Sequence, residues 1–158
     1  MTDHPNDLVI SRYLAVPRAK LWRAWSDPAL LAQWWCPKPW TTEVRGFDLR
    51  PGGIFHTIMR GPNPGEISGG DDDAGVFLEV VPMERIVFTS ALAPGWRPVA
   101  SWLVMTAVFT MADEGEGTRY VARCMHKDKA DADKHAEMGF FDGWGTCVTQ
   151  LEALAKTL

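Results

Sequence analysis

A single apolar stripe near the end of the sequence constrains the fold more than any other feature. Six apolar side chains recur there at intervals of four, three, four, three and four residues: Phe140, Trp144, Cys147, Leu151, Leu154 and Leu158. This spacing places all six on one face of an α-helix. One long helix cannot bury its own apolar face, so the rest of the chain must supply a large apolar surface against which it packs.

The middle of the sequence predicts that this surface is an antiparallel β-sheet. Apolar and polar residues alternate from residue 41 onward, in runs separated by turns rich in glycine and proline. We expect about six to seven strands, within residues 7–16, 41–49, 54–60, 76–82, 85–92, 101–111 and 118–127. Short turns between consecutive strands favour antiparallel pairing, and the predicted fold class is therefore α+β.

Two short helices are expected between the first strand and the remaining strands, one beginning at Pro17 and one over residues 28–35. Pro17 suits a first helical turn, and Asp27 followed by Pro28 is typical of a helix N-cap with proline at the first helical position. With 158 residues, the chain is expected to form one domain over residues 8–158, after a short polar extension at residues 1–7.

Three glycines near the start of the final helix need an explanation. Gly139, Gly143 and Gly145 would each lower helix stability by about 0.5–1 kcal/mol relative to alanine. We interpret them as permitting a bend, or the close approach of a strand, a loop or a ligand to the helix backbone.

Charge and composition exclude several classes of function. The net charge is −4, the isoelectric point is near 5.5 and no run of lysine or arginine occurs, so nucleic acid is not an expected partner. The most apolar stretch, residues 102–111, is too short to span a membrane, and the first residues do not resemble a signal peptide. Three widely spaced cysteines do not predict a disulfide framework. We therefore expect a cytoplasmic protein that does not interact with membranes.

The order of the predicted elements, together with three sequence motifs, resembles a known family. The motifs are "PGGIFHTIMRGP" at residues 51–62, "GVFLEVVP" at residues 75–82, and Gly143-Trp144 followed by spaced leucines. They are similar to those of single-domain proteins related to the C-terminal domain of the activator of heat-shock protein 90 ATPase. That family lies in the START and birch-pollen-allergen-like superfamily, also called SRPBCC. The resemblance covers residues 8–158 and implies a helix-grip fold, in which a curved antiparallel sheet wraps around the C-terminal helix and leaves a cavity between them.

Strand alternation predicts which side chains face this cavity. Phe55, Thr57 and Met59 share one face of their strand, and we expect that face to point inward. Two registers remain open for residues 76–82. Either Phe77 and Glu79 point inward, or the strand is turned by one residue and Glu79 lies in water.

The strand at residues 118–127 completes the predicted cavity wall. Tyr120 and His126 are expected to point inward, and Arg119 and Arg123 outward. The full set of predicted cavity residues is Trp35, Phe55, Thr57, Met59, Phe77, Glu79, Phe88, Ser90, Tyr120, Met138, Phe141 and Trp144.

The sequence contains no motif for nucleotide binding or for an activated nucleophile. Cys124 and His126 share a strand face. His56 and His135 stand at no ligand spacing to that pair, so neither a metal nor a cofactor is expected. The aspartate-rich segment at residues 69–75 lacks the calcium-binding EF-hand pattern, and we interpret it as a solvated loop.

These observations favour a binding protein for a small apolar molecule, such as an aromatic one, rather than an enzyme. One alternative is an enzyme similar to polyketide cyclases and aromatases, for which Glu79, Tyr120 and His126 are the candidate acid–base residues. A second alternative, implied by the resemblance alone, is a co-chaperone-like interaction domain. The tryptophans crowded at residues 22–40 predict core packing, with a partner surface or a homodimer interface as the other interpretation.

Overall fold

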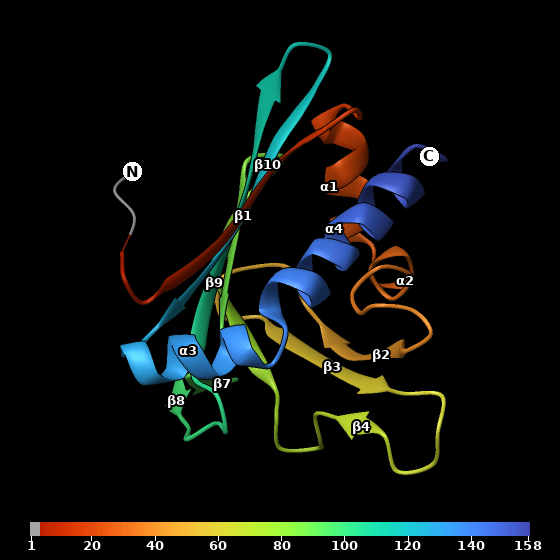
Figure 1. The fold of residues 1–158 in the computed structure, drawn as a ribbon. Helices are drawn as coiled ribbons and strands as arrows, with labels where there is room; N and C mark the ends of the chain where they lie inside the picture. The colour runs from red at the N-terminus through yellow and green to blue at the C-terminus, as the bar shows by residue number, and fades with distance from the viewer. Residues whose placement is uncertain (1–3) are drawn as a thin grey trace.

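The computed structural model describes residues 4–158, which form one curled antiparallel sheet, a small hairpin and four helices (Figure 1). The strands of the sheet are β1 (Asp7–Leu14), β2 (Thr41–Phe47), β3 (Ile54–Arg60), β4 (Ile67–Ser68), β5 (Gly75–Val81), β6 (Arg85–Thr89), β9 (Met105–Glu114) and β10 (Gly117–His126). The hairpin consists of β7 (Leu92–Ala93) and β8 (Arg97–Pro98). The helices are α1 (Arg18–Ser26), α2 (Pro28–Leu31), α3 (Lys129–Glu137) and α4 (Phe140–Ala155).

The strands of the sheet follow the order β1-β10-β9-β6-β5-β3-β2, with β4 added to β3. Every pair is antiparallel, as the short turns of the sequence predict. The pairing of β3 with β5 is confined to two residue pairs, Ile54 with Val76 and Phe55 with Gly75. Farther along β3, Met59 and Arg60 pair with β4 instead, and residues of β3, β4 and the start of β5 line one of the two hollows described below.

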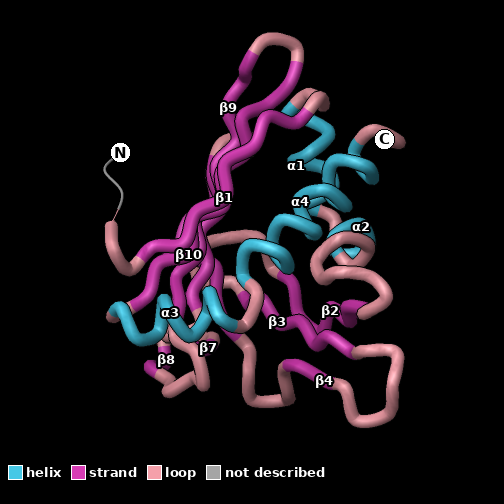
Figure 2. The backbone as a smooth tube through the Cα atoms, in the orientation of Figure 1, coloured by secondary structure: helices cyan, strands magenta, loops and turns pink. Residues whose placement is uncertain are grey.

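Helix α4 lies against the curled sheet, and α1 and α2 lie beside it (Figures 1 and 2). Its buried face contains Phe140, Val148, Leu151 and Ala155. The remaining members of the predicted stripe are partly buried against the same core. The predicted α+β helix-grip architecture is therefore confirmed. None of the helices formed by residues 4–158 combines the length and the apolar character needed to cross a membrane.

The C-terminal segment forms two helices rather than one. Gly139 has a φ of 93°, in the left-handed region that favours glycine, and it separates α3 from α4. The first of the three glycines therefore ends one helix and begins the next, so it does not weaken a helix interior.

A β-bulge decides the register that the sequence left open in β5. The pairing with β6 shifts between Phe77 and Glu79, so one residue is inserted and the strict alternation of faces is broken. As a result Phe77 is fully buried and Val80 packs against the same core, whereas Glu79 is half-exposed and forms an ion pair with Arg85.

Two predicted elements are shorter in the structure than in the sequence-based prediction. The helix expected over residues 28–35 ends at Leu31 and continues as turns, and the strand expected from residue 101 begins at Met105.

Arg123 lies on the outer face of the sheet, as the sequence predicts, but it is not solvated there. The residue is only 9% exposed, and its Nη1 donates to Asp7 Oδ2 at 3.0 Å.

Candidate functional site

A cavity of about 190 Å³ lies between α4 and the inner face of the sheet. Its walls come from α4, from the segment after α2, and from β3, β6, β9 and β10. The lining residues are Trp34, Trp35, Pro37, Met59, Phe88, Met105, Phe109, Tyr120, Ala122, Gly143, Trp144, Cys147 and Val148. Aromatic rings and aliphatic side chains dominate this set, so the cavity is suited to an apolar guest.

A second hollow of about 150 Å³ adjoins the first and shares the walls formed by Trp35, Met59, Phe88 and Met105. It extends away from α4 toward the loop residues 68–75 and the segment before β9. Hydroxyl groups are more frequent here. They belong to Thr57, Ser68, Thr89, Ser90 and Ser101.

Eight of the predicted cavity residues line one or both hollows. They are Trp35, Phe55, Thr57, Met59, Phe88, Ser90, Tyr120 and Trp144. They come from five separate parts of the chain, and the curl of the sheet around α4 brings them together. Their role in binding a ligand is a prediction to which we return below.

Four predicted cavity residues lie elsewhere. Phe77 is fully buried in the core behind Phe55, with ring centroids 4.8 Å apart, and it lines neither hollow. Glu79 is turned to the outer side by the bulge in β5. Met138 and Phe141 are 54% and 53% exposed, because the break at Gly139 rotates the chain there and Phe141 stands one residue past the buried Phe140.

Several lining residues were not predicted from the sequence, among them Phe109, Met105, Cys147 and Gly143. A signal existed for β9, where Thr106 and Thr110 alternate with apolar residues and mark the opposite face. No comparable signal existed for Trp34, which lies in the irregular segment after α2.

The second and third glycines of α4 have different roles. Gly143 lines the cavity, and a Cβ atom added to it would meet no atom within 4 Å. Gly145 lies against Arg12 instead: Arg12 Nη1 donates to the carbonyl oxygen of Gly145 at 3.0 Å, and an added Cβ would lie 2.7 Å from Nη2. The absence of a side chain at Gly143 therefore widens the cavity, and at Gly145 it makes room for a guanidinium group.

The hydroxyl group of Tyr120 is a polar anchor in the wall of the larger cavity. Tyr120 is 1% exposed, and its oxygen accepts a hydrogen bond from Trp25 Nε1 at 2.9 Å. Within residues 4–158 no group accepts the hydrogen of this hydroxyl. Burial raises the pKa of Tyr120, so the hydroxyl stays protonated and remains a donor near neutral pH.

The three candidate acid–base residues are not brought together. Tyr120 lines the cavity, whereas Glu79 lies on the outer side of the sheet. His126 lines neither hollow and packs instead with Cys124 and His135, beside the cavity wall. Proton transfer between these groups and a bound molecule would need hydrogen-bond contact at a common point, and this arrangement does not provide it.

Comparison with known proteins identifies the fold and the family. Residues 15–156 match the family described as "Activator of Hsp90 ATPase homolog 1-like protein". The crystal structure of a Nitrosomonas europaea protein is 44% identical, with a TM-score of 0.89, and the match covers 99% of this chain and 97% of that chain.

Two further solved structures are more distant. A Mycobacterium smegmatis protein is 26% identical, with a TM-score of 0.79 over 95% of this chain and 90% of that chain. A Chromobacterium violaceum protein is 27% identical, with a TM-score of 0.75 over 96% and 98%. No curated protein matches the chain.

Proposed function

The chain belongs to the family of activator of Hsp90 ATPase homolog 1-like proteins, and we propose that it binds a small aromatic molecule between α4 and the sheet. The fold of this family commonly holds hydrophobic ligands. The observation that carries the proposal is the cavity of about 190 Å³, whose walls are mostly aromatic and aliphatic. An apolar space of this kind is poorly hydrated, so an apolar guest gains free energy by entering it.

The size of the cavity suggests the size of the ligand. An engineered apolar cavity of roughly 150 Å³ is large enough to bind benzene. The larger hollow here therefore accommodates one aromatic ring, and the adjoining hollow leaves room for a substituent or a second ring. The rings of Phe109 and Trp144 lie nearly parallel, with centroids 5.9 Å apart, and they offer flat surfaces for stacking.

The hydroxyl of Tyr120 suggests a polar feature of the ligand. Because this buried hydroxyl already accepts from Trp25 and has a hydrogen to donate, it would favour a ligand with a carbonyl or ether oxygen. The proposed ligand class is therefore an aromatic molecule of one or two rings that carries a hydrogen-bond acceptor. The separation of Glu79 and His126 from the cavity supports binding rather than acid–base catalysis as the function.

The test is a titration with one- and two-ring aromatic compounds, with and without a carbonyl group. Tryptophan fluorescence and the melting temperature report binding. Gly143→Leu places a side chain into the cavity at a position where an added Cβ meets no atom within 4 Å, so it should abolish binding. Thr146→Leu, on the exposed side of the same helix, is the matched control and should bind normally.

Tyr120→Phe tests the proposed anchor separately. It keeps the ring and removes the donor, so carbonyl compounds should lose affinity by roughly 2–10-fold, in line with one hydrogen bond of about 0.5–1.5 kcal/mol. Compounds without an acceptor should be little affected. The proposal is wrong if no compound gives a saturable signal, or if Gly143→Leu binds as well as Thr146→Leu.

A further inference from the structure

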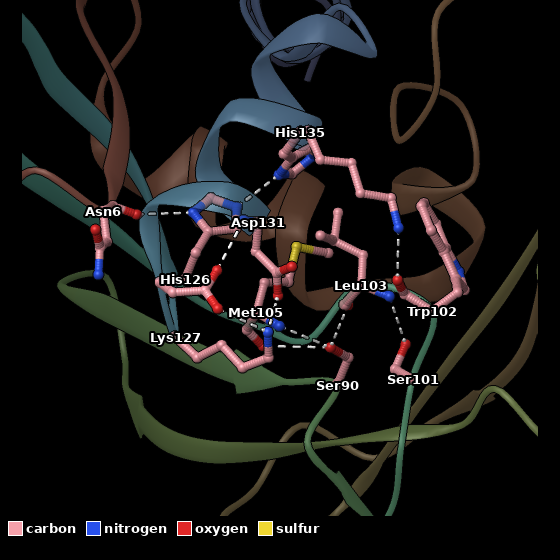
Figure 3. Close-up of polar contacts among 12 residues, drawn as sticks. Asn6, Ser90, Ser101, Trp102, Leu103, Met105, His126, Lys127, Asp131 and His135 are labelled. Carbon is pink, nitrogen blue, oxygen red and sulfur yellow. Dashed lines mark hydrogen bonds and ion pairs between the residues drawn. The ribbon is translucent and has the colours of Figure 1, made fainter.

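Three buried side chains with metal-binding atoms meet beside the cavity. Cys124 and His126 lie on the inner face of β10, and His135 comes from α3, which packs on the same strand. Their exposed fractions are 0%, 7% and 7%. The sequence showed the pair on β10, but only the path of α3 after the sheet brings His135 to it. Figure 3 shows His126 and His135 turned toward one another.

The sulfur-to-nitrogen distances are close to those around one metal ion, whereas the two nitrogens lie at hydrogen-bond distance from each other. Cys124 Sγ lies 3.6 Å from His126 Nε2 and 3.7 Å from His135 Nδ1, and the two nitrogens are 2.9 Å apart. A tetrahedral ion with bonds of about 2.3 Å to sulfur and 2.0–2.1 Å to nitrogen separates such atoms by about 3.3–3.6 Å. Small movements of the imidazole rings would therefore be enough to admit an ion.

The surrounding contacts orient His126 as a ligand. Its Nδ1 donates to the backbone carbonyl oxygen of Asn6 at 2.8 Å (Figure 3). A carbonyl oxygen can only accept, so Nδ1 carries the hydrogen and Nε2, in the neutral ring, presents its lone pair to the cluster. Imidazole ligands of metal ions are commonly held in this way by a second hydrogen bond.

In the metal-free protein the lone pair of His126 Nε2 already has a partner. His135 Nδ1 lies 2.9 Å away and donates to it, because Nε2 can only accept. A bound ion would replace this hydrogen bond, with the hydrogen of the His135 ring moving to its Nε2 and the Cys124 thiol giving up its proton to solvent.

We propose that Cys124, His126 and His135 bind one thiophilic transition-metal ion, with Cu(I) preferred to Zn(II). Two observations select Cu(I). Met105 Sδ lies 3.3 Å from Cys124 Sγ, and a thioether is a ligand for copper rather than for zinc. A thiolate with Cu(I) has no net charge, whereas Zn(II) would leave one positive charge in a buried site, where an uncompensated charge is unfavourable.

The test starts from purified protein treated with a chelator. Cobalt(II) is added as a spectroscopic probe, because a thiolate ligand gives it a charge-transfer band, and Cu(I) binding is measured anaerobically by competition with a chromophoric chelator. We expect one ion per chain. In Cys124→Ala the cobalt charge-transfer band should disappear, and Cu(I) affinity should fall by more than about 100-fold, since even outer-shell partners change metal affinity by roughly 10–100-fold.

Matched variants separate the site from other groups of the same kind. Cys147→Ala removes a partly buried thiol outside the cluster, and His56→Gln changes a buried imidazole that contacts Gly70 instead. Both should retain the band and the affinity. Met105→Leu should weaken Cu(I) and leave Zn(II) binding unchanged. Circular dichroism and melting curves establish that each variant is folded.

Three results would overturn the proposal. The wild-type protein could give neither a cobalt charge-transfer band nor measurable Cu(I) binding. The band could persist in Cys124→Ala, or Cys147→Ala could lose the band and the Cu(I) affinity to the same extent as Cys124→Ala. If zinc binds more tightly than Cu(I) and Met105→Leu has no effect on either metal, the three-ligand site stands and the preference for copper is refuted.

Discussion

The two interior glycines of α4 give the sharpest test of how the sequence shapes the cavity. Replacing either by alanine favours the helix by about 0.5–1 kcal/mol through backbone entropy alone. At Gly143 nothing opposes this gain, because the new Cβ meets no atom within 4 Å. For a chain of this length we expect Gly143→Ala to raise the melting temperature by about 1–4 °C.

At Gly145 the same substitution should have the opposite effect. The new Cβ lies 2.7 Å from Arg12 Nη2, so the guanidinium group must move. The hydrogen bonds from Arg12 Nη1 to Gly145 O at 3.0 Å and to Thr149 Oγ1 at 2.9 Å are then weakened or lost. Because charged hydrogen bonds contribute about 1.5–3 kcal/mol when buried and less when solvated, we expect a net loss of about 0.5–2 kcal/mol.

Urea unfolding of the two variants and the wild type measures both effects. Comparing Arg12→Ala with the double variant Arg12→Ala/Gly145→Ala isolates the cause of the effect at Gly145. Without the Arg12 guanidinium nothing occupies the space beside residue 145, so Gly145→Ala should then be stabilising. Equal stabilisation by Gly143→Ala and Gly145→Ala in the wild-type background would refute this reasoning. So would a loss of stability in Gly143→Ala.

Three further predictions concern residues around the cavity. Phe77→Ala removes a fully buried ring stacked on Phe55 and should lower the free energy of unfolding by about 3–5 kcal/mol, as measured by urea titration. Glu79→Gln breaks only a half-exposed ion pair with Arg85, so stability should change by less than about 1 kcal/mol and ligand titrations should be unchanged. Burial raises the pKa of Cys147 to about 12, so alkylation of this thiol, followed by mass spectrometry, should be slow and should accelerate about tenfold per pH unit between pH 7 and 10. A rate that levels off near pH 9, or one that an aromatic ligand fails to lower, would contradict the last prediction and the placement of Cys147 in the cavity wall.

The architecture was predictable because its signals are local and repeated. The stripe on α4 and the alternation in β3 and β10 depend on periods that any short window of sequence contains. The inward side of β3 followed from Phe55, Thr57 and Met59 for the same reason.

The remaining features depend on single irregular residues or on distant packing. One inserted residue in β5 turns Glu79 away from the interior, and alternation alone cannot locate such a bulge. One left-handed glycine, Gly139, rotates the chain so that Met138 and Phe141 point outward. The approach of His135 to Cys124 depends on how α3 returns over β10, which no spacing in the sequence encodes.

The most direct test of ligand binding is nuclear magnetic resonance of the methionine methyl groups in metal-free protein, during titration with an aromatic carbonyl compound. Met59 and Met105 line both hollows, whereas Met83 and Met138 are 38% and 54% exposed and lie outside them. Ring currents from a bound aromatic molecule should move the first two resonances saturably, with one common dissociation constant, and leave the other two in place. Unchanged Met59 and Met105 resonances across the panel of compounds, or equal shifts at all four positions, would contradict the proposal that this cavity is a binding site.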